Sequence, residues 1–321
     1  MNLPAALLVV RCLARDTFRQ SLASRTFWLI LGLTGLVVLL CLSVRLEGYT
    51  AYTPKGEIEL FGPDRQPFTG QNKEAGTFSV AFGAIRLRQF RDGQAEVLFL
   101  QSVLAKWGAG AVGLLLVLLW TSGFLPEFLD PRAATVLLAK PVPRWGLLAG
   151  KYLGVLAFVA FQASVFVGGT WLALGLATNV WHPAYLLTVP LLVLEFAVLY
   201  SVSVLLAVWT RNTVVCVFGT LLFWAMCSSI GVSRHASVAA GEAPATRAQA
   251  AVQAAYWVLP KPADVVLLLD GVLQSDRHFL GAPQQQAMRQ AVGPELSLLT
   301  SLLFTGAVLS LAGRRFVTRE Y

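Results

Sequence analysis

The sequence predicts an all-α polytopic membrane protein with six transmembrane helices and a small extracytoplasmic α+β insertion between the first two. Hydrophobic residues make up 56% of the chain and charged residues only 13%, against roughly 45–50% and 25% in soluble domains. Several uncharged segments approach the length of about 20 apolar residues that crosses a bilayer. A stretch rich in charges and prolines, 124–152, interrupts them, so the chain must leave the membrane there and enter it again.

The N-terminal part, residues 1–26, is predicted to form a cytoplasmic or interfacial helix. Arg11, Arg15 and Arg19 recur at every fourth position beside an apolar arc, which is typical of a helix at the lipid headgroups. A plain cytoplasmic extension of the first span is the alternative. The first span, 27–44, carries no charge, and no convincing cleavage site follows it. It is therefore predicted to stay as an anchor rather than to act as a signal peptide.

Residues 45–106 form a polar insertion that we expect to be a small extracytoplasmic lobe. Its first part is rich in Gly and Pro, whereas residues 77–90 alternate apolar and polar side chains. A period of two predicts a pair of strands. Residues 94–107 are predicted to form a helix leading into the next span. The lobe either shapes an exit path or binds a partner, or it is a structural cap without a ligand.

The remaining five spans are predicted from apolar runs that follow the insertion. They are predicted at 107–125, 147–173, 184–209, 213–231 and 297–312, with a cytoplasmic loop at 126–146 and a cytoplasmic tail at 313–321. The long segment 232–296 is predicted to be extracytoplasmic. Within it, 248–259, 259–262 and 265–269 are apolar enough to form surface or partly re-entrant helices.

The distribution of charge predicts that both termini face the cytoplasm. Pieces assigned to that side hold twelve basic residues against four acidic ones. The other side holds thirteen against twelve, nearly all in the two long loops, which translocate largely regardless of charge. The basic excess is therefore an orientation signal. It does not indicate nucleic-acid binding, because the basic residues are dispersed at span ends without a recognition motif.

Motifs for catalysis and cofactor binding are absent from the sequence. It contains no GxxxxGK[ST] phosphate loop, no HExxH and no GxSxG. The four cysteines form no CxxC pair, and the three histidines lie far apart and outside the predicted spans (His182, His235 and His278). We therefore expect a chain that is not an enzyme, binds no cofactor and holds no metal.

Glu195 is the one acidic residue deep in a predicted span. A charged group there costs roughly 2.5 kcal/mol or more on insertion scales, so it should face other helices or water. One interpretation is a polar contact on a transport path. The other is a protonated or hydrogen-bonded packing residue near Thr188 or Ser201.

The loop after the second span carries a specific series of residues. The series is Glu127 and Asp130, Ala134-Thr135, Leu137-Leu138, Lys140-Pro141-Val142, Arg144, Leu147-Leu148 and Gly150-Lys151. It resembles the loop between the second and third spans of ABC-2 type transporter permeases, although Ala134 stands where that family usually has Gly. This match covers about a tenth of the chain. Tyr256, Leu259 and Pro260 also match a YxxLP-like segment before the family's last span.

The resemblance implies a permease subunit of an ABC transporter in the cell inner membrane, which exports an unidentified substrate. A separate ATPase subunit would hydrolyse the ATP, and a second permease subunit, identical or different, would complete the transporter. The residues implied in ATPase coupling are Glu127, Asp130, Arg132, Thr135, Lys140, Pro141 and Arg144. The alternative interpretation of Pro141 is an ordinary loop proline without a role in coupling.

Two other classes stay open. A secondary transporter should carry more intramembrane charges, or broken helices at matching positions of two halves, whereas the sequence shows one Glu and no obvious repeat. A membrane-anchored assembly or sensor protein could be built around the 45–106 lobe.

Overall fold

Six helices among the described residues are long and apolar enough to cross a bilayer. The computed structural model describes residues 3–47, 49–52, 58–61, 77–88, 93–128, 144–240, 247–273 and 293–318. The six candidate spans are Arg25–Leu42, Glu96–Pro126, Trp145–Thr178, Pro183–Thr210, Thr213–Val238 and Leu296–Thr318. The predicted class, a helical multi-pass membrane protein with six such helices, is confirmed.

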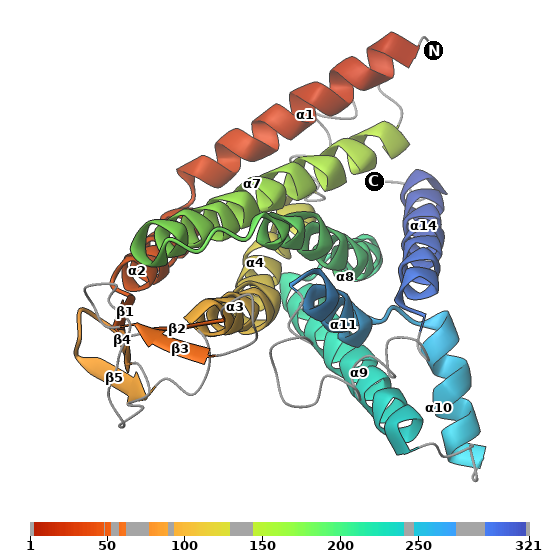
Figure 1. The fold of residues 1–321 in the computed structure, drawn as a ribbon. Helices are drawn as coiled ribbons and strands as arrows, with labels where there is room; N and C mark the ends of the chain where they lie inside the picture. The colour runs from red at the N-terminus through yellow and green to blue at the C-terminus, as the bar shows by residue number, and fades with distance from the viewer. Residues whose placement is uncertain are drawn as a thin grey trace.

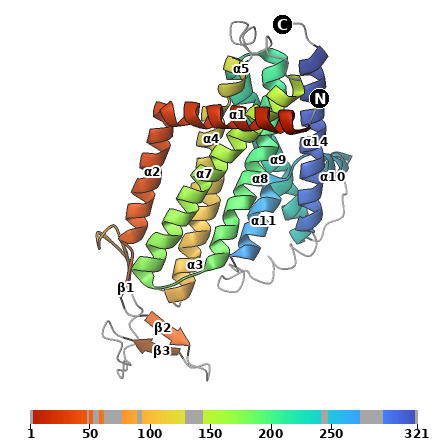
Figure 2. The ribbon, with the colours of Figure 1, turned by 90° about the horizontal axis from the view of Figure 1, so that it is seen from above.

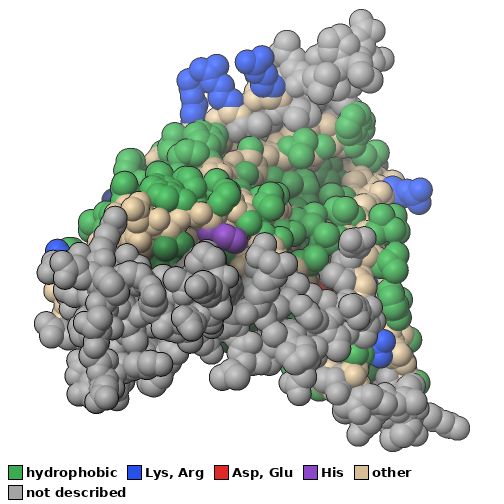
Figure 3. Space-filling view, in the orientation of Figure 1, with side chains coloured by type: hydrophobic (Ala, Val, Ile, Leu, Met, Phe, Trp, Pro, Cys, Tyr) green, Lys and Arg blue, Asp and Glu red, His purple; other side chains and the backbone are tan. Residues whose placement is uncertain are grey.

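One central helix organises the bundle. Helix α8 (Thr188–Thr210) packs against α7 (Arg144–Thr178), α9 (Thr213–Ala240) and α14 (Pro294–Thr318). Its side chains Phe196, Tyr200 and Val204 belong to the main buried cluster. The helices on the outside of the bundle expose Leu, Val, Phe and Trp, and Figure 3 shows hydrophobic side chains over much of the described helical surface. An apolar exterior of this kind suits a hydrocarbon surrounding.

The second candidate span is built from four consecutive helical pieces. They are α3 (Gly93–Val103), η1 (Leu104–Gly113), α4 (Leu114–Thr121) and α5 (Phe124–Phe128). The piece η1 is a π-helix, and the carbonyl of residue i−5 lies close to two of its glycines. A Cβ on Gly110 would lie 3.1 Å from the Ala105 carbonyl oxygen, and one on Gly113 would lie 3.1 Å from that of Gly108. Glycine therefore fits this unusual segment.

Helix α1 (Leu3–Ala23) lies across one end of the bundle, as Figure 2 shows. The chain turns at Ser24, which has extended backbone angles (φ −74°, ψ 134°), and then enters α2 (Arg25–Leu42). Phe18 packs edge-on against Phe158 and Phe161 of α7 at centroid distances of 5.7 and 5.6 Å. Helix α1 is thus no straight extension of α2. Its crosswise position, with exposed arginines, fits the predicted interfacial helix.

Short strands lie between α2 and α3. Strands β1 (Arg45–Glu47), β4 (Thr77–Val80) and β5 (Ile85–Arg88) form one antiparallel sheet, and β2 (Tyr49–Tyr52) pairs with β3 (Ile58–Phe61). The predicted strand pair is confirmed, with Thr77 opposite Arg88 and Val80 opposite Ile85. In Figure 2, β1, β2 and β3 lie at the end of the bundle opposite α1.

Two shorter helices precede α14. Helix α10 (Arg247–Val258) packs against α9 and α14, and α11 (Pro262–Val272) packs against α8, α9 and α14. Buried residues of α11 include Val265, Leu267 and Leu269. Figure 2 shows α11 running alongside α8, so this piece of the predicted surface or re-entrant segment lies inside the bundle.

The close approach of α9 to α11 gives a first prediction. A Cβ on Gly231 would lie 2.7 Å from the Cβ of Ala263, whereas nothing lies within 4 Å of one on Gly32. We expect Gly231→Leu to lower the free energy of unfolding by about 1–3 kcal/mol through overpacking, and Gly32→Leu to leave it within about 0.5 kcal/mol. Thermal unfolding of the two purified variants in detergent measures the difference. Equal melting temperatures would show that α11 does not need this contact.

Candidate functional site

The loop predicted to couple to an ATPase begins at α5 and ends at α7. Figure 2 places α5 at the same end of the bundle as α1 and both chain termini. Glu127 lies in α5 and Arg144 begins α7, and only their backbone is described. The other predicted coupling residues lie outside the described residues: Asp130, Arg132, Thr135, Lys140 and Pro141.

Both flanks of this loop are anchored through Lys151, which is only 6% exposed. Its Nζ donates a hydrogen bond to Gln20 Oε1 of α1 over 3.0 Å. The same ammonium lies 5.6 Å from the centre of the Phe124 ring in α5, within the range of a cation–π contact. One lysine of α7 therefore joins α1, α5 and α7 at this end of the bundle. The sequence placed Lys151 in the matching loop but did not show that it is buried.

Glu195 lies in α8 and is 8% exposed. It lines a cavity of about 20 Å³ together with Lys261, Ser297 and Ser301, roughly enough for one water molecule. The neighbours considered from the sequence do not bind it. Ser201 donates to the Val198 carbonyl, and the Thr188 hydroxyl has no hydrogen-bond partner among the residues that the structure describes. Lys261, which lies in the connection between α10 and α11, lines the same cavity.

Beside this cavity, the Asp264 carboxylate holds four helices together. It lies in the first turn of α11 and is 1% exposed. Tyr256 of α10 and Ser297 of α14 donate to Oδ2 at 2.6 and 2.5 Å. His235 of α9 lies with Nε2 2.8 Å from Oδ1. Both carboxylate oxygens are thus occupied, which is what a buried carboxylate needs to offset its desolvation.

Lys261 is buried next to this carboxylate. Its Nζ donates to Thr300 Oγ1 at 2.5 Å and lies 4.9 and 4.8 Å from the ring centres of Tyr256 and Trp257. Burial lowers the pKa of Lys261, and the Asp264 charge partly offsets this effect. Burial also raises the pKa of Tyr256, as does its hydrogen bond to Asp264, so the tyrosine stays a donor.

Because the pKa of Lys261 is lower in the folded protein than in the unfolded chain, the free energy of unfolding depends on pH. Between that pKa and the ordinary value of 10.5, the unfolded chain binds more protons than the folded protein. Lys261 therefore makes the free energy of unfolding rise with pH in that window.

A second ion pair, of a partly buried lysine and a buried aspartate, lies at the other end of α11. Lys106 of η1 forms an ion pair with Asp270 of α11, and the side chains are 22% and 5% exposed. The π-helical part of the second candidate span is therefore tied to α11. This pair and four other ionisable side chains lie in the interior of the bundle or at its edge. The other four are Glu195, His235, Lys261 and Asp264.

The sequence prediction missed most of this cluster. His235 was placed outside the spans; α9 continues past Gly231, where the predicted fifth span ends, and carries His235 in its last turns. Lys261 and the apolar run VVLLL between Asp264 and Asp270 were predicted to belong to surface or partly re-entrant helices, but the three charged side chains were not predicted to be buried.

The arrangement does not form a hydrolytic centre. Ser297 and His235 both bind Asp264 instead of each other, whereas a serine nucleophile needs the histidine as its base. Among the residues that the structure describes, no group of three His, Cys, Asp or Glu side chains is placed to hold a metal ion. The geometry favours fixed internal charges and helix attachment.

No known protein family, curated protein or solved structure matches the chain. Its fold and interior define it as a multi-pass helical membrane protein with ionisable side chains clustered between α8, α9, α10, α11 and α14.

Proposed function

We propose that the chain is the permease subunit of an ABC transporter of the ABC-2 type. It exports a substrate across the cell inner membrane with ATP hydrolysed by a separate ATPase subunit, and it pairs with a second permease subunit. In this proposal both termini and the loop between α5 and α7 lie in the cytoplasm, and the strands lie on the other side. The residue series of that loop and the charge distribution support it.

The observation that carries the proposal is the Lys151 junction. A partner pushing on the loop would act at both of its ends, since α5 precedes it and α7 follows it. Leu125 and Leu148 are buried there, and Lys151 holds α1 and α5 against α7. The three helices would therefore move together. Helix α7 is 35 residues long, about 50 Å at 1.5 Å per residue, so the movement would reach the far end of the bundle.

A cross-linking experiment tests both the partner and the side of the membrane. Three of the four cysteines are buried and Cys12 is exposed, so Cys12→Ser gives a background of low reactivity. In this background we expect Lys140→Cys to cross-link to a co-expressed ATPase subunit encoded beside the permease. Phe82→Cys is the matched control, because Phe82 is 76% exposed in the turn between β4 and β5.

A membrane-impermeant thiol reagent added to intact cells should label the cysteine at position 82 and not the one at position 140. Labelling of position 140 from outside, or cross-linking from neither Arg132→Cys nor Lys140→Cys, would refute the proposal.

The interior charges favour a second candidate function, an ion-coupled secondary transporter. Such proteins hold ionisable residues near their substrate path, and Glu195 and Lys261 line one small cavity inside the bundle. The two candidates differ in their energy source. In proteoliposomes, a secondary transporter would respond to a pH or sodium gradient without any ATPase subunit, whereas the ABC permease would need the subunit and ATP.

A further inference from the structure

The turn between β4 and β5 presents a large aromatic side chain to its surroundings. It consists of Ala81, Phe82, Gly83 and Ala84, with none of the polar residues that are common in turns. Its backbone is closed by a hydrogen bond from the Ala84 N–H to the Ala81 carbonyl over 3.1 Å. Phe82 is 76% exposed, the highest value among the large hydrophobic side chains that the structure describes.

The backbone of this turn is unfavourable for the residues that occupy it. Three consecutive residues have positive φ angles, 57° at Ala81, 56° at Phe82 and 90° at Gly83. Glycine, asparagine and aspartate adopt such angles far more readily than a bulky side chain does. The exposed Phe82 ring gives the fold little packing in return. Strain of this kind is typical of residues with a role outside the packing of their own domain.

The strand register brings the turn back to the end of α2. Strand β1 leaves α2, and Arg45 of β1 lies opposite Ser79 of β4. Because β4 runs antiparallel to β1, it runs back toward α2, and the turn that follows β4 lies nearest to that helix. The Ala81 N–H donates to Ser43 Oγ over 2.9 Å, and Ser43 is the residue that caps the C-terminus of α2. Phe82 therefore lies at the depth of the last turn of α2.

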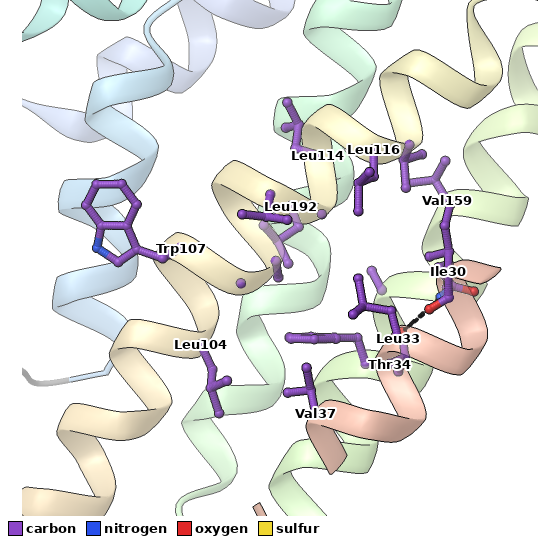
Figure 4. A pocket seen from close by; sticks show the side chains of 18 of the residues that line it. Ile30, Leu33, Thr34, Val37, Leu104, Trp107, Leu114, Leu116, Val159 and Leu192 are labelled. Carbon is purple, nitrogen blue, oxygen red and sulfur yellow. Dashed lines mark hydrogen bonds between the residues drawn. The ribbon is translucent and has the colours of Figure 1, made fainter. Parts of the chain in front are cut away.

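That depth is the boundary between hydrocarbon and lipid headgroups. Helix α2 has 18 residues, about 27 Å at 1.5 Å per residue, close to the roughly 30 Å of a bilayer's hydrocarbon core. Its surroundings are apolar along its length: Leu29 and Leu40 are 73% and 41% exposed, and Figure 4 shows Leu33 and Val37 lining an apolar pocket on another side. Ser43 thus marks the level at which the chain leaves the hydrocarbon.

We propose that Phe82 inserts into the lipid leaflet on the side of the strands and anchors the sheet to the bilayer surface. Interfacial elements bury their apolar side chains about 5–10 Å into the boundary between headgroups and acyl chains. Arg45 lies beside the turn and is exposed, so it suits the phosphates of the same layer. This layer is hydrated, and a small thiol in place of the ring would still meet water-soluble reagents.

A protein partner fits this turn less well than lipid does. A stable protein interface takes about 800 Å² from each partner, whereas the turn offers one large side chain. Lipid needs no such area, because α2 already holds the turn at the bilayer surface through Ser43.

Photo-cross-linking of the purified chain in phosphatidylcholine nanodiscs tests the proposal. The probe is the photoreactive amino acid p-benzoylphenylalanine, introduced in place of Phe82. We expect irradiation to attach one phospholipid to the peptide that contains position 82, as detected by mass spectrometry. The same probe in place of Leu36 is the positive control, because Leu36 is 55% exposed within the first candidate span.

A second experiment leaves the chain free of the probe. Phosphatidylcholine with a diazirine near the ester end of one acyl chain should label residues 77–86 of the wild type. Phe82→Gly removes the ring and suits the positive φ angle, so the turn should keep its backbone and its labelling should fall about tenfold, which corresponds to about 1.4 kcal/mol. Phe82→Trp, which keeps a large aromatic ring, should retain the labelling. Labelling of α2 should be equal in all three proteins.

A probe at position 82 that captures no lipid, while the probe at position 36 does, would overturn the proposal. So would capture of a second copy of the chain in place of lipid, or equal labelling of the wild type and Phe82→Gly. Neither experiment contains an ATPase subunit or depends on which side of the membrane the strands face. Their failure therefore leaves the proposed transport function untouched.

Discussion

Replacing Asp264 with alanine is expected to destabilise the folded protein by about 3–5 kcal/mol. The reason is that removing one member of a buried charged network leaves the other members without the group they interact with. Tyr256, Ser297 and His235 would lose their shared acceptor, and each buried donor would then lack a partner. Lys261, whose pKa the Asp264 charge raises, would also lose its neighbouring anion. Thermal or denaturant unfolding of the purified variant in detergent measures the loss.

Two further variants separate this network from a general effect of removing a carboxylate. Asp16→Ala removes an exposed carboxylate of α1 and should change stability by no more than about 0.5 kcal/mol. Asp264→Asn keeps one oxygen acceptor, so its cost should fall between the two. If Asp264→Ala unfolds with the native midpoint, the network contributes nothing to the attachment of α11.

Local features of the fold were predictable because each depends on a short stretch of consecutive residues. The uncharged run within α2 and the period of two in 77–90 each depend on consecutive residues only. The turn at Ser24 follows from a similar local signal, since the basic, amphipathic residues before it favour the headgroup region and the apolar ones after it favour hydrocarbon.

The candidate sites depend on residues that lie far apart in the chain. No short stretch of sequence contains both partners of such a contact. Lys106 meets Asp270, and Gln162 meets Thr34. Glu195 could be singled out by its cost in a membrane, but its neighbour Lys261 could not, because a lysine between two prolines looks like an ordinary loop residue. The π-helix was also beyond prediction, since its glycines suit an α-helical span equally well.

The interior charges lie at the two ends of α11. Helix α11 is short and lies within the bundle, and both of its ends need attachment. Asp264 at its first turn and Asp270 near its last turn bind different helices. Apolar packing alone would let such a helix slide or rotate, whereas two charged contacts of fixed geometry specify one register.

The Lys106–Asp270 pair should show strong coupling in a double-mutant cycle. Lys106→Met removes the ammonium that pairs with the Asp270 carboxylate, which is 5% exposed, and Asp270→Leu removes the carboxylate that pairs with the Lys106 ammonium. Each single change is expected to cost about 3–5 kcal/mol, whereas the double variant should cost clearly less than either, because it removes the desolvation of both charges. Unfolding of the wild type and the three variants in the same detergent gives the coupling energy. Additive losses would mean that the two charges act independently, and α11 would then be held at that end by its apolar contacts.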